Sequence, residues 1–160
     1  MTNRPKNIGT AAETAVVRAA TTRGFPYAER LALAGHLDQG DVRLAPWVHL
    51  EVKGGRAAEQ ASDTQIEAWM VELERELANA NAMAGALITK RAGIGPANAH
   101  RWWAHVRASW LAQWRHYPGD IPAPGAGSTV HDCTVRMPLD SLLVQLRVAG
   151  YGTPLGQETL

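Results

Sequence analysis

The feature of this chain that most constrains its fold is an amphipathic helical segment between two segments of strand character. Residues 62–81 carry apolar side chains at helical spacing, namely Ile66, Trp69, Met70, Leu73 and Leu77. Before them, Trp47–Lys53 alternates between apolar and polar side chains, and after them Gly85–Lys90 is a short apolar run typical of a buried strand. A helix between two strands packs on the sheet that they form. The sequence therefore predicts an α/β fold, a mixed central β-sheet flanked by helices.

The N-terminal part is predicted to form a helix and an extended segment. Thr10 and Glu13 make a T-x-x-E capping box, so we expect a helix that begins at Thr10 and ends at Gly24. Tyr27–Ala34 is expected to be extended, and residues 35–40 contain turn-forming types before the next strand.

A β-hairpin should follow this turn. Its arms are Val42–Leu44 and Trp47–Lys53, with Pro46 in the connecting turn, where its missing N–H harms no ladder. In the second arm alternate side chains point to opposite faces. We expect the core face to carry Val48, Leu50 and Val52, and the other face to carry Trp47, His49, Glu51 and Lys53.

The C-terminal half is predicted to continue the sheet and close with a helix. The expected order is a strand over Arg101–Arg107, a short helix over Ser109–Arg115, a Pro/Gly-rich loop over Tyr117–Gly127, a strand over Thr129–Met137 and a helix over Leu139–Ala149. Residues 108–128 are predicted to be an insertion that decorates the fold.

Length and cysteine content bound the class of protein. A chain of 160 residues is the size of one ordinary domain, so we expect a single domain over residues 1–160. Cys133 is its only cysteine, which excludes an internal disulfide and a Cys-rich zinc site. The N-terminus has no apolar run typical of a signal peptide, and no segment reaches the roughly 20 apolar residues of a membrane helix. We expect a cytoplasmic protein without a membrane segment.

The charge is unevenly distributed, although the formal net charge is only +1. Residues 1–56 contain eight Lys and Arg against five Asp and Glu, residues 57–89 contain one against six, and residues 90–150 contain seven against three. If the two basic segments share a face, a phosphate backbone can bind there. A mixed, solvated surface explains the same counts equally well.

Three side chains around the hairpin form a pattern suited to a metal ion. Glu51 and Lys53 share one face of a strand, and Asp41 lies just upstream at the hairpin entrance. Mg²⁺ prefers oxygen ligands and accepts one or two carboxylates while it keeps several waters, which matches Asp41, Glu51 and the backbone carbonyl of Val52. Lys53 is one of three lysines in a chain with thirteen arginines, so its presence at this position favours a chemical role over solubility. The alternative interpretation is a surface Glu51–Lys53 ion pair on an exposed hairpin.

In the order and approximate spacing of its motifs, this chain resembles the PD-(D/E)XK nuclease superfamily, and within it the small Holliday junction resolvases of archaea and phages. The motifs are Gly9–Glu13, an extended segment with Arg30, the Gly40-Asp41 pair and the strand Leu50–Lys53. The resemblance covers roughly residues 8–92. Gly40 stands where the superfamily's name expects proline, and residues 100–128 match the compact resolvases poorly.

The resemblance implies a restriction-endonuclease-like fold and a metal-dependent endonuclease that resolves four-way DNA junctions as a homodimer. It implies that Asp41 and Glu51 are metal ligands, that Lys53 is the catalytic lysine, and that Glu13 on the first helix approaches the metal through water. Mg²⁺ is the expected cofactor, with Mn²⁺ able to replace it, and a bacterial cell or a phage-infected host is the expected setting. The alternatives are another nuclease of this superfamily that acts on flaps, ends or specific sequences, and a DNA-binding protein of the same fold that does not cut.

Several further candidates have a structural alternative beside the functional one. Glu13 can be the second half of its capping box, and Gln65 can cap the helix that follows Ser62. Lys90 and Arg91 end a strand, where they contact either phosphate or solvent, and His49 shares the face of Glu51. In residues 100–117 four tryptophans are interspersed with three arginines, namely Trp102, Trp103, Trp110 and Trp114 with Arg101, Arg107 and Arg115. Packing in a core or a dimer contact is favoured there over stacking on bases.

Overall fold

The computed structural model describes residues 4–31, 40–114 and 132–157 of the chain. Its helices are α1 (Arg4–Thr21), α2 (Gly55–Glu59), α3 (Asp63–Asn79), the 3₁₀ helix η1 (Pro96–Arg101), α4 (Ala108–Trp114) and α5 (Leu139–Val148). Its strands are β1 (Glu29–Arg30), β2 (Val42–Ala45), β3 (Val48–Lys53), β4 (Ala84–Thr89), β5 (Trp103–Arg107) and β6 (Thr134–Pro138).

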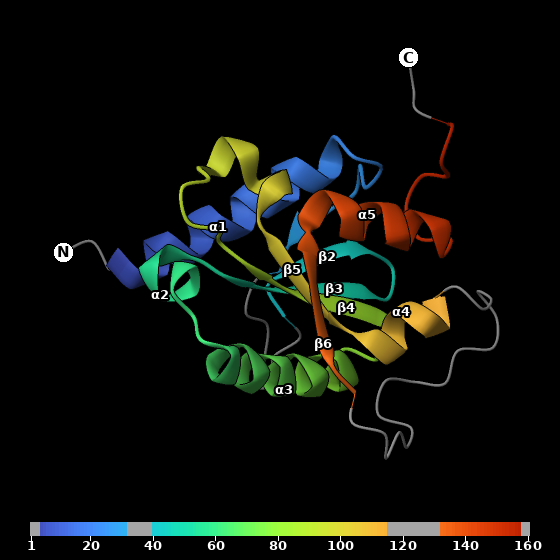
Figure 1. Cartoon of the computed structure of the whole chain (residues 1–160). Coiled ribbons are helices and arrows are strands. Elements are labelled where there is room, and N and C mark those ends of the chain that lie inside the picture. Colours follow the sequence, from blue (N-terminus) through green and yellow to red (C-terminus); the bar gives the residue numbers. More distant parts are fainter. Residues whose placement is uncertain (1–3, 32–39, 115–131, 158–160) are drawn as a thin grey trace.

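The described strands form one six-stranded mixed sheet, in which each strand pairs with its neighbours in sequence (Figure 1). The β3–β4 pair is parallel, because α2 and α3 carry the chain back across the sheet between them. The other four pairs are antiparallel. The predicted α/β class with a mixed sheet flanked by helices is confirmed.

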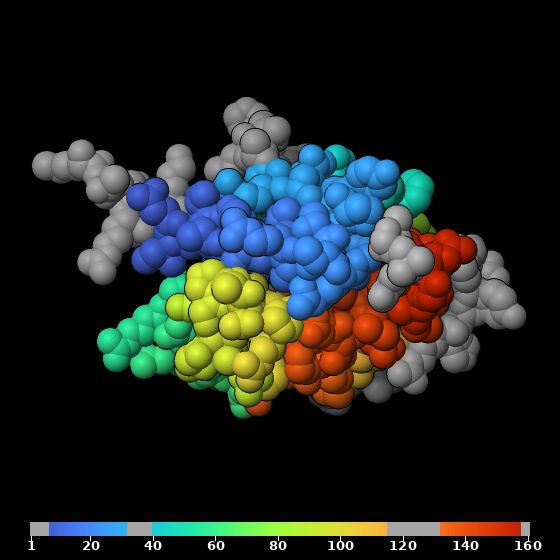
Figure 2. All heavy atoms as spheres, turned by 90° about the horizontal axis from the view of Figure 1, so that it is seen from above, coloured from blue at the N-terminus to red at the C-terminus, as the bar shows by residue number. Residues whose placement is uncertain are grey.

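Helices cover both faces of this sheet. In Figure 1, α1, η1 and α5 lie on one face and α3 lies on the other. Seen from above in Figure 2, α1, the segment that contains η1, and α5 lie side by side as one layer. The core therefore has two halves, one on each side of the sheet.

The alternation of β3 follows the sequence prediction, with one difference. Val48, Leu50 and Val52 are buried as expected. His49 and Glu51, on the opposite face, are buried as well, because α3 covers that face. The hairpin is therefore an internal part of the sheet and carries no exposed Glu51–Lys53 surface pair.

The capping box predicted at Thr10 and Glu13 is wrong. Helix α1 begins at Arg4, and Thr14 Oγ1 donates to the Thr10 carbonyl at 2.8 Å, as expected inside a helix. Pro5 lies in the first turn, where a missing N–H costs no intrahelical bond, so the helix can begin before Thr10. The predicted end is confirmed, since α1 stops at Thr21 and Gly24 adopts a left-handed conformation with φ of 94°.

Three other boundaries differ from the sequence prediction. Trp47 belongs to the hairpin turn, with φ of 63°, and β3 begins one residue later. Arg101 ends η1, and β5 begins at Trp103. Within the predicted extended segment 27–34, strand β1 covers only Glu29–Arg30, and residues 32–34 lie outside the described part.

The remaining elements agree with the prediction within a few residues. They are α3, β4, α4, β6 and α5. The predicted loop Tyr117–Gly127 and residues 129–131 of the predicted last strand lie outside the described residues. No helix within the described ranges is long and apolar enough to cross a membrane.

Three tryptophans of the C-terminal half belong to the core of the chain itself. Trp102, Trp110 and Trp114 are all buried, which confirms packing over base stacking for these three side chains. Trp110 and Trp114 lie in α4, inside the region predicted as an insertion. Because they are already covered within one chain, they provide no surface for a subunit contact.

We expect Trp110→Ala to lower the free energy of unfolding by about 3–5 kcal/mol, the usual cost of removing a buried aromatic side chain. Val144→Ala on α5 is the control, because Val144 is 43% exposed and such a surface change costs no more than about 0.5 kcal/mol. Urea denaturation at several protein concentrations measures both. A loss for Trp110→Ala that is absent at low protein concentration and appears only as the concentration rises would instead place this side chain in a dimer contact.

Candidate active site

Asp41 is held against strand β3 by two hydrogen bonds. Its backbone N–H donates to the Leu50 carbonyl at 2.9 Å, and its carboxylate Oδ2 accepts from the Val52 N–H at 2.9 Å. Gly40, with φ of 88°, allows the turn that brings the chain into β2 at this point. The Asp41 carboxylate is thereby fixed at the edge of β3, where Glu51 and Lys53 are located.

Glu51 and Lys53 lie on the α3 face of β3 and contact each other. Lys53 Nζ is 2.5 Å from Glu51 Oε1 and 3.6 Å from Glu72 Oε2 on α3. It also lies 5.8 Å from the centroid of the Trp69 ring, a cation–π distance. The structure therefore brings together the three residues Asp41, Glu51 and Lys53 that the sequence singled out.

Burial makes both carboxyl groups of this site weak acids. The pKa of Asp41 is raised to about 7, mainly by burial and secondly by the charge of Glu51, whereas the hydrogen bond from Val52 opposes this shift. Burial also raises the pKa of Glu51 to about 7, although its hydrogen bond and ion pair with Lys53 act in the opposite direction. Two such groups side by side favour either a shared proton or a bound cation near neutral pH.

Lys53 remains a cation in this environment. Burial alone would lower the pKa of the ammonium group, but the hydrogen bond and charge of Glu51, with the charges of Glu72 and Asp41, raise it above its ordinary value. Lys53 therefore supplies a permanent positive charge beside the two carboxyl groups.

Glu13 reaches the site from the other layer. On α1, it accepts a hydrogen bond from Arg30 Nε at 2.8 Å, and Arg30 Nη2 also donates to Thr10 Oγ1 at 3.4 Å. The charge of Glu13 further raises the pKa of Asp41. Glu13 thus lies close enough to Asp41 to act on it electrostatically, while Arg30 holds its carboxylate in place.

Two glutamates of α3 belong to this site but were not singled out from the sequence. Glu76 is only 6% exposed and makes a hydrogen bond to Glu51 that contributes to the raised pKa of Glu51. Glu72 contacts Lys53 one turn earlier on the same helix. The sequence did hold a signal for Glu76, because it lies three residues after Leu73, within the apolar stripe that faces the sheet.

The donor set at Asp41, Glu51 and Val52 fits a Mg²⁺-type cation. Within the described part of the chain no group of three or more His, Cys, Asp or Glu side chains is arranged to hold a metal ion. Mg²⁺ does not require three, since it binds through one or two carboxylates and keeps several waters. In a strand the N–H and C=O of one residue point to the same side, so the Val52 carbonyl points to the side where its N–H meets Asp41. The charge of Glu51 also raises the pKa of Asp41, and a bound cation would oppose that shift.

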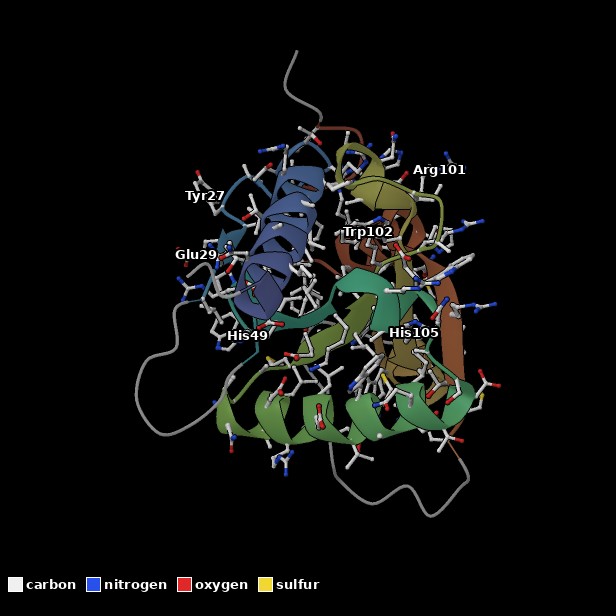
Figure 3. All side chains as sticks on the ribbon, turned by 90° about the vertical axis from the view of Figure 1, so that its left-hand side faces the viewer. Tyr27, Glu29, His49, Arg101, Trp102 and His105 are labelled. Carbon is white, nitrogen blue, oxygen red and sulfur yellow. The ribbon has the colours of Figure 1, made fainter. Side chains whose placement is uncertain are left out.

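The remaining candidates from the sequence have structural surroundings. Gln65 is exposed in the first turn of α3, and its N–H donates to the capping Ser62 Oγ at 3.2 Å. Lys90 Nζ lies 2.7 Å from Glu59 Oε1, and Arg91 lies over the Trp103 ring at 4.0 Å. His49 is buried on the same strand as Glu51, and Figure 3 shows it on the α3 side of the sheet, toward the C-terminal half of that helix.

Comparisons of this chain with protein-family models, with curated proteins and with solved structures give no match.

The raised pKa of Asp41 leads to a stability prediction. Between pH 3.8 and about 7, the native chain binds more protons at Asp41 than the unfolded chain, so this residue lowers the free energy of unfolding as pH rises. Asp41→Asn keeps a hydrogen-bond acceptor but removes the charge. We expect the variant to become more stable than the wild type above pH 7, by at least about 1 kcal/mol or a Tm increase of roughly 2–4 °C.

The gain should become small at pH 4 and approach zero below about pH 3, where the wild-type carboxyl group is protonated in both the native and the unfolded state. Thermal melting in EDTA at a series of pH values measures it. Glu29→Gln, at an exposed carboxylate of β1, is the control and should change stability by less than about 0.5 kcal/mol at any pH. A gain for Asp41→Asn that is equal at pH 4 and pH 8 would show that burial does not disfavour this charge.

Proposed function

We propose that this chain is a metal-dependent DNA endonuclease that hydrolyses phosphodiester bonds at Asp41, Glu51 and Lys53. The observation that carries the proposal is the convergence of the buried Glu51, the half-buried Asp41 and one lysine at the junction of β2 and β3, where the charge of Glu13 also acts. A purely structural ion pair needs one carboxylate for one ammonium. Here Glu51, Glu72 and Asp41 all act on Lys53, so carboxyl groups outnumber ammonium groups, and a divalent cation would neutralise the excess negative charge.

Asp41, Glu51 and the Val52 carbonyl would hold Mg²⁺. When bound, the ion would make its water more acidic and stabilise negative charge on the phosphate. Asp41 is oriented for this task by the Val52 N–H, and Glu51 by Lys53. Glu13 would contribute negative charge to Asp41 without direct coordination, because its own carboxylate is held by Arg30.

Lys53 is the residue that would act on the reacting phosphate. Its ammonium group has three N–H donors, of which one donates to Glu51 Oε1, while Glu72 lies at an ion-pair distance of 3.6 Å. A further N–H can donate to a phosphate oxygen or to the attacking water. Such a preorganised donor stabilises charge that develops in the transition state.

The substrate that we propose is branched DNA, with a four-way junction as the first choice, and the working unit is a homodimer. Both proposals come from the resemblance in motif order, and a two-fold dimer would match the near-symmetry of a four-way junction. Flaps, DNA ends and specific duplex sequences are the alternative substrates.

We expect Mg²⁺ or Mn²⁺ to raise the Tm of the protein and to be required for DNA cleavage. Binding to the native state alone stabilises by mass action, and the carboxyl groups must be ionised to bind, so the increase in Tm should be larger at pH 8 than at pH 5.5. Ca²⁺ should also raise the Tm but support little cleavage, because its coordination is less strict.

Thermal melting and cleavage of labelled four-way, flap, single-stranded and linear duplex DNA test this together. Asp41→Asn should lose both the Tm increase and cleavage, whereas the control Glu29→Gln should keep both. Undiminished cleavage in excess EDTA would exclude a metal-dependent mechanism.

We expect Lys53→Ala to reduce the cleavage rate by roughly 100- to 1,000-fold while it changes DNA affinity only modestly. Lys53→Arg should be almost as slow, because a planar guanidinium group cannot replace a compact ammonium group at a positioned site. Single-turnover cleavage at saturating Mg²⁺ and fluorescence anisotropy in Ca²⁺ separate rate from affinity. If both variants cut at rates near the wild type, the active site is not at Glu51–Lys53.

A further inference from the structure

A second polar site lies beside the candidate active site, on the same face of the sheet. It is a cavity of about 450 Å³ between the sheet and the N-terminal half of α3. Figure 3 shows His105 over that half of α3. We call it the His105 cavity, and its lining includes Thr89, Trp103, His105 and Arg136 from the sheet, and Asp63 and Glu67 from α3.

The lining of the His105 cavity includes two buried polar side chains. Thr89 is 2% exposed and His105 is 4% exposed, and Thr89 Oγ1 lies 2.9 Å from His105 Nε2. The pKa of His105 is lowered to about 4, mainly by burial and secondly by the charge of Arg136, so the imidazole is neutral at neutral pH. The cavity thus offers hydrogen-bonding groups without a cation at this position.

Strand register places the His105 cavity next to Lys53. Lys53 on β3 is paired with Thr89 on β4, and Thr89 is paired with Trp103 on β5. In-register residues of neighbouring strands share a face and lie roughly 5 Å apart. The cavity therefore begins one strand away from Lys53 and extends to the β6 edge.

Two arginines flank one indole at this cavity. Arg91 lies 4.0 Å and Arg136 lies 4.7 Å from the centroid of the Trp103 ring. Within the described residues, neither guanidinium group is in ion-pair contact with a carboxylate, in contrast to Arg107 and Arg30. Stacking on a ring uses the face of a guanidinium group and leaves its N–H edge available for phosphate oxygens.

The charges of the cavity wall limit what can enter. Glu67 is bound to Arg107 and Thr134, and Glu59, also in the wall, is bound to Lys90. With Asp63, these carboxylates disfavour an anion inside. A neutral planar heterocycle with both donors and acceptors fits better, because its N–H groups can donate to carboxylates and its acceptors can accept from Arg136.

We propose that the His105 cavity accepts one unpaired nucleobase of the bound DNA while the adjacent phosphate lies at Arg91 and Arg136. This inference rests on the proposed function for the identity of the ligand, and it narrows the substrate to DNA with unpaired nucleotides close to the cut. A stacked strand advances about 3.4 Å per nucleotide, so the distance from Lys53 to the His105 cavity corresponds to roughly one to three nucleotides. Entry costs least for a base that is already unpaired, as at a branch or a splayed end.

The test compares the affinity of the full chain for two forked duplexes in Ca²⁺, measured by fluorescence anisotropy. One fork has unpaired thymidines next to the branch, and the other has abasic nucleotides at the same positions. We expect the wild type to bind the thymidine fork about 5- to 100-fold more tightly, the usual range for one base contact. Equal affinity for the two forks would overturn the proposal.

Two variants test whether the preference arises in the His105 cavity. Ala61→Phe places a large side chain at a partly buried residue of the cavity lining, so the affinity for the thymidine fork should fall to that for the abasic fork. Ala97→Phe makes the same change at an exposed position of η1 and should leave the preference intact. Asp63→Ala, which only truncates an exposed side chain, should also reduce the preference and covers the case in which Ala61→Phe does not fold. Arg91→Gln should instead lower the affinity for both forks by a similar factor, because it removes a phosphate contact and leaves the cavity unchanged.

A wild-type preference that survives both Ala61→Phe and Asp63→Ala would place the base elsewhere and overturn the proposal. Cleavage of the same forks in Mg²⁺ separates this inference from the proposed function. If the protein cleaves the forks but binds both equally, the proposed nuclease function stands and the base site is overturned. If it prefers the thymidine fork through the cavity but does not cleave, the base site stands and the nuclease function is overturned. Absence of binding to either fork would overturn both.

Discussion

The packing of α3 on the face of β3 and β4 that carries Glu51 and Lys53 is the constraint on which the site depends. Gly85 makes this packing possible, since a Cβ atom at this position would lie 2.4 Å from Leu77 Cδ2 and 2.8 Å from the His49 carbonyl oxygen. The helix can therefore approach the sheet closely, and it removes His49 and Glu51 from solvent. Without α3, Glu51 and Lys53 would form an exposed ion pair of little energetic value.

The same helix compensates much of the charge that it brings to the sheet. Arg107 on β5 donates to Glu67 at 2.6 Å and to Glu74 at 2.7 Å, so the acidic side of α3 is tied to the β5–β6 end of the sheet. Lys53 forms an ion pair with Glu72 in the middle of α3. The acidic segment that masks two basic segments in the sequence is thus partly neutralised by cations from both of them. At the other side of Lys53, burial raises the pKa of both Asp41 and Glu51.

The sheet also determines the relation between the candidate active site and the His105 cavity. Both lie on the α3 face, and the parallel β3–β4 pair sets Lys53 beside Thr89. One helix covers both, with its C-terminal half toward His49 and its N-terminal half at His105 (Figure 3). A DNA strand that passes Lys53 toward the β6 edge would meet the Arg91–Trp103–Arg136 stack next, so a phosphate site and a base site can act on one strand.

The sequence by itself determined the α/β class, the hairpin, α3, β4 and the grouping of Asp41, Glu51 and Lys53, because periodicity and strand alternation are local properties. It misplaced the start of α1, since a Thr-x-x-Glu pattern has the same local appearance inside a helix as at its cap, and only the contact with Arg30 shows the role of Glu13. The burial of the second face of β3, the place of Glu76 beside Glu51, and the stacking of Arg91 and Arg136 on Trp103 were decided by tertiary structure alone. These features depend on contacts between residues 12 to 33 positions apart in the sequence, and no local pattern encodes the desolvation and pairing that such contacts produce.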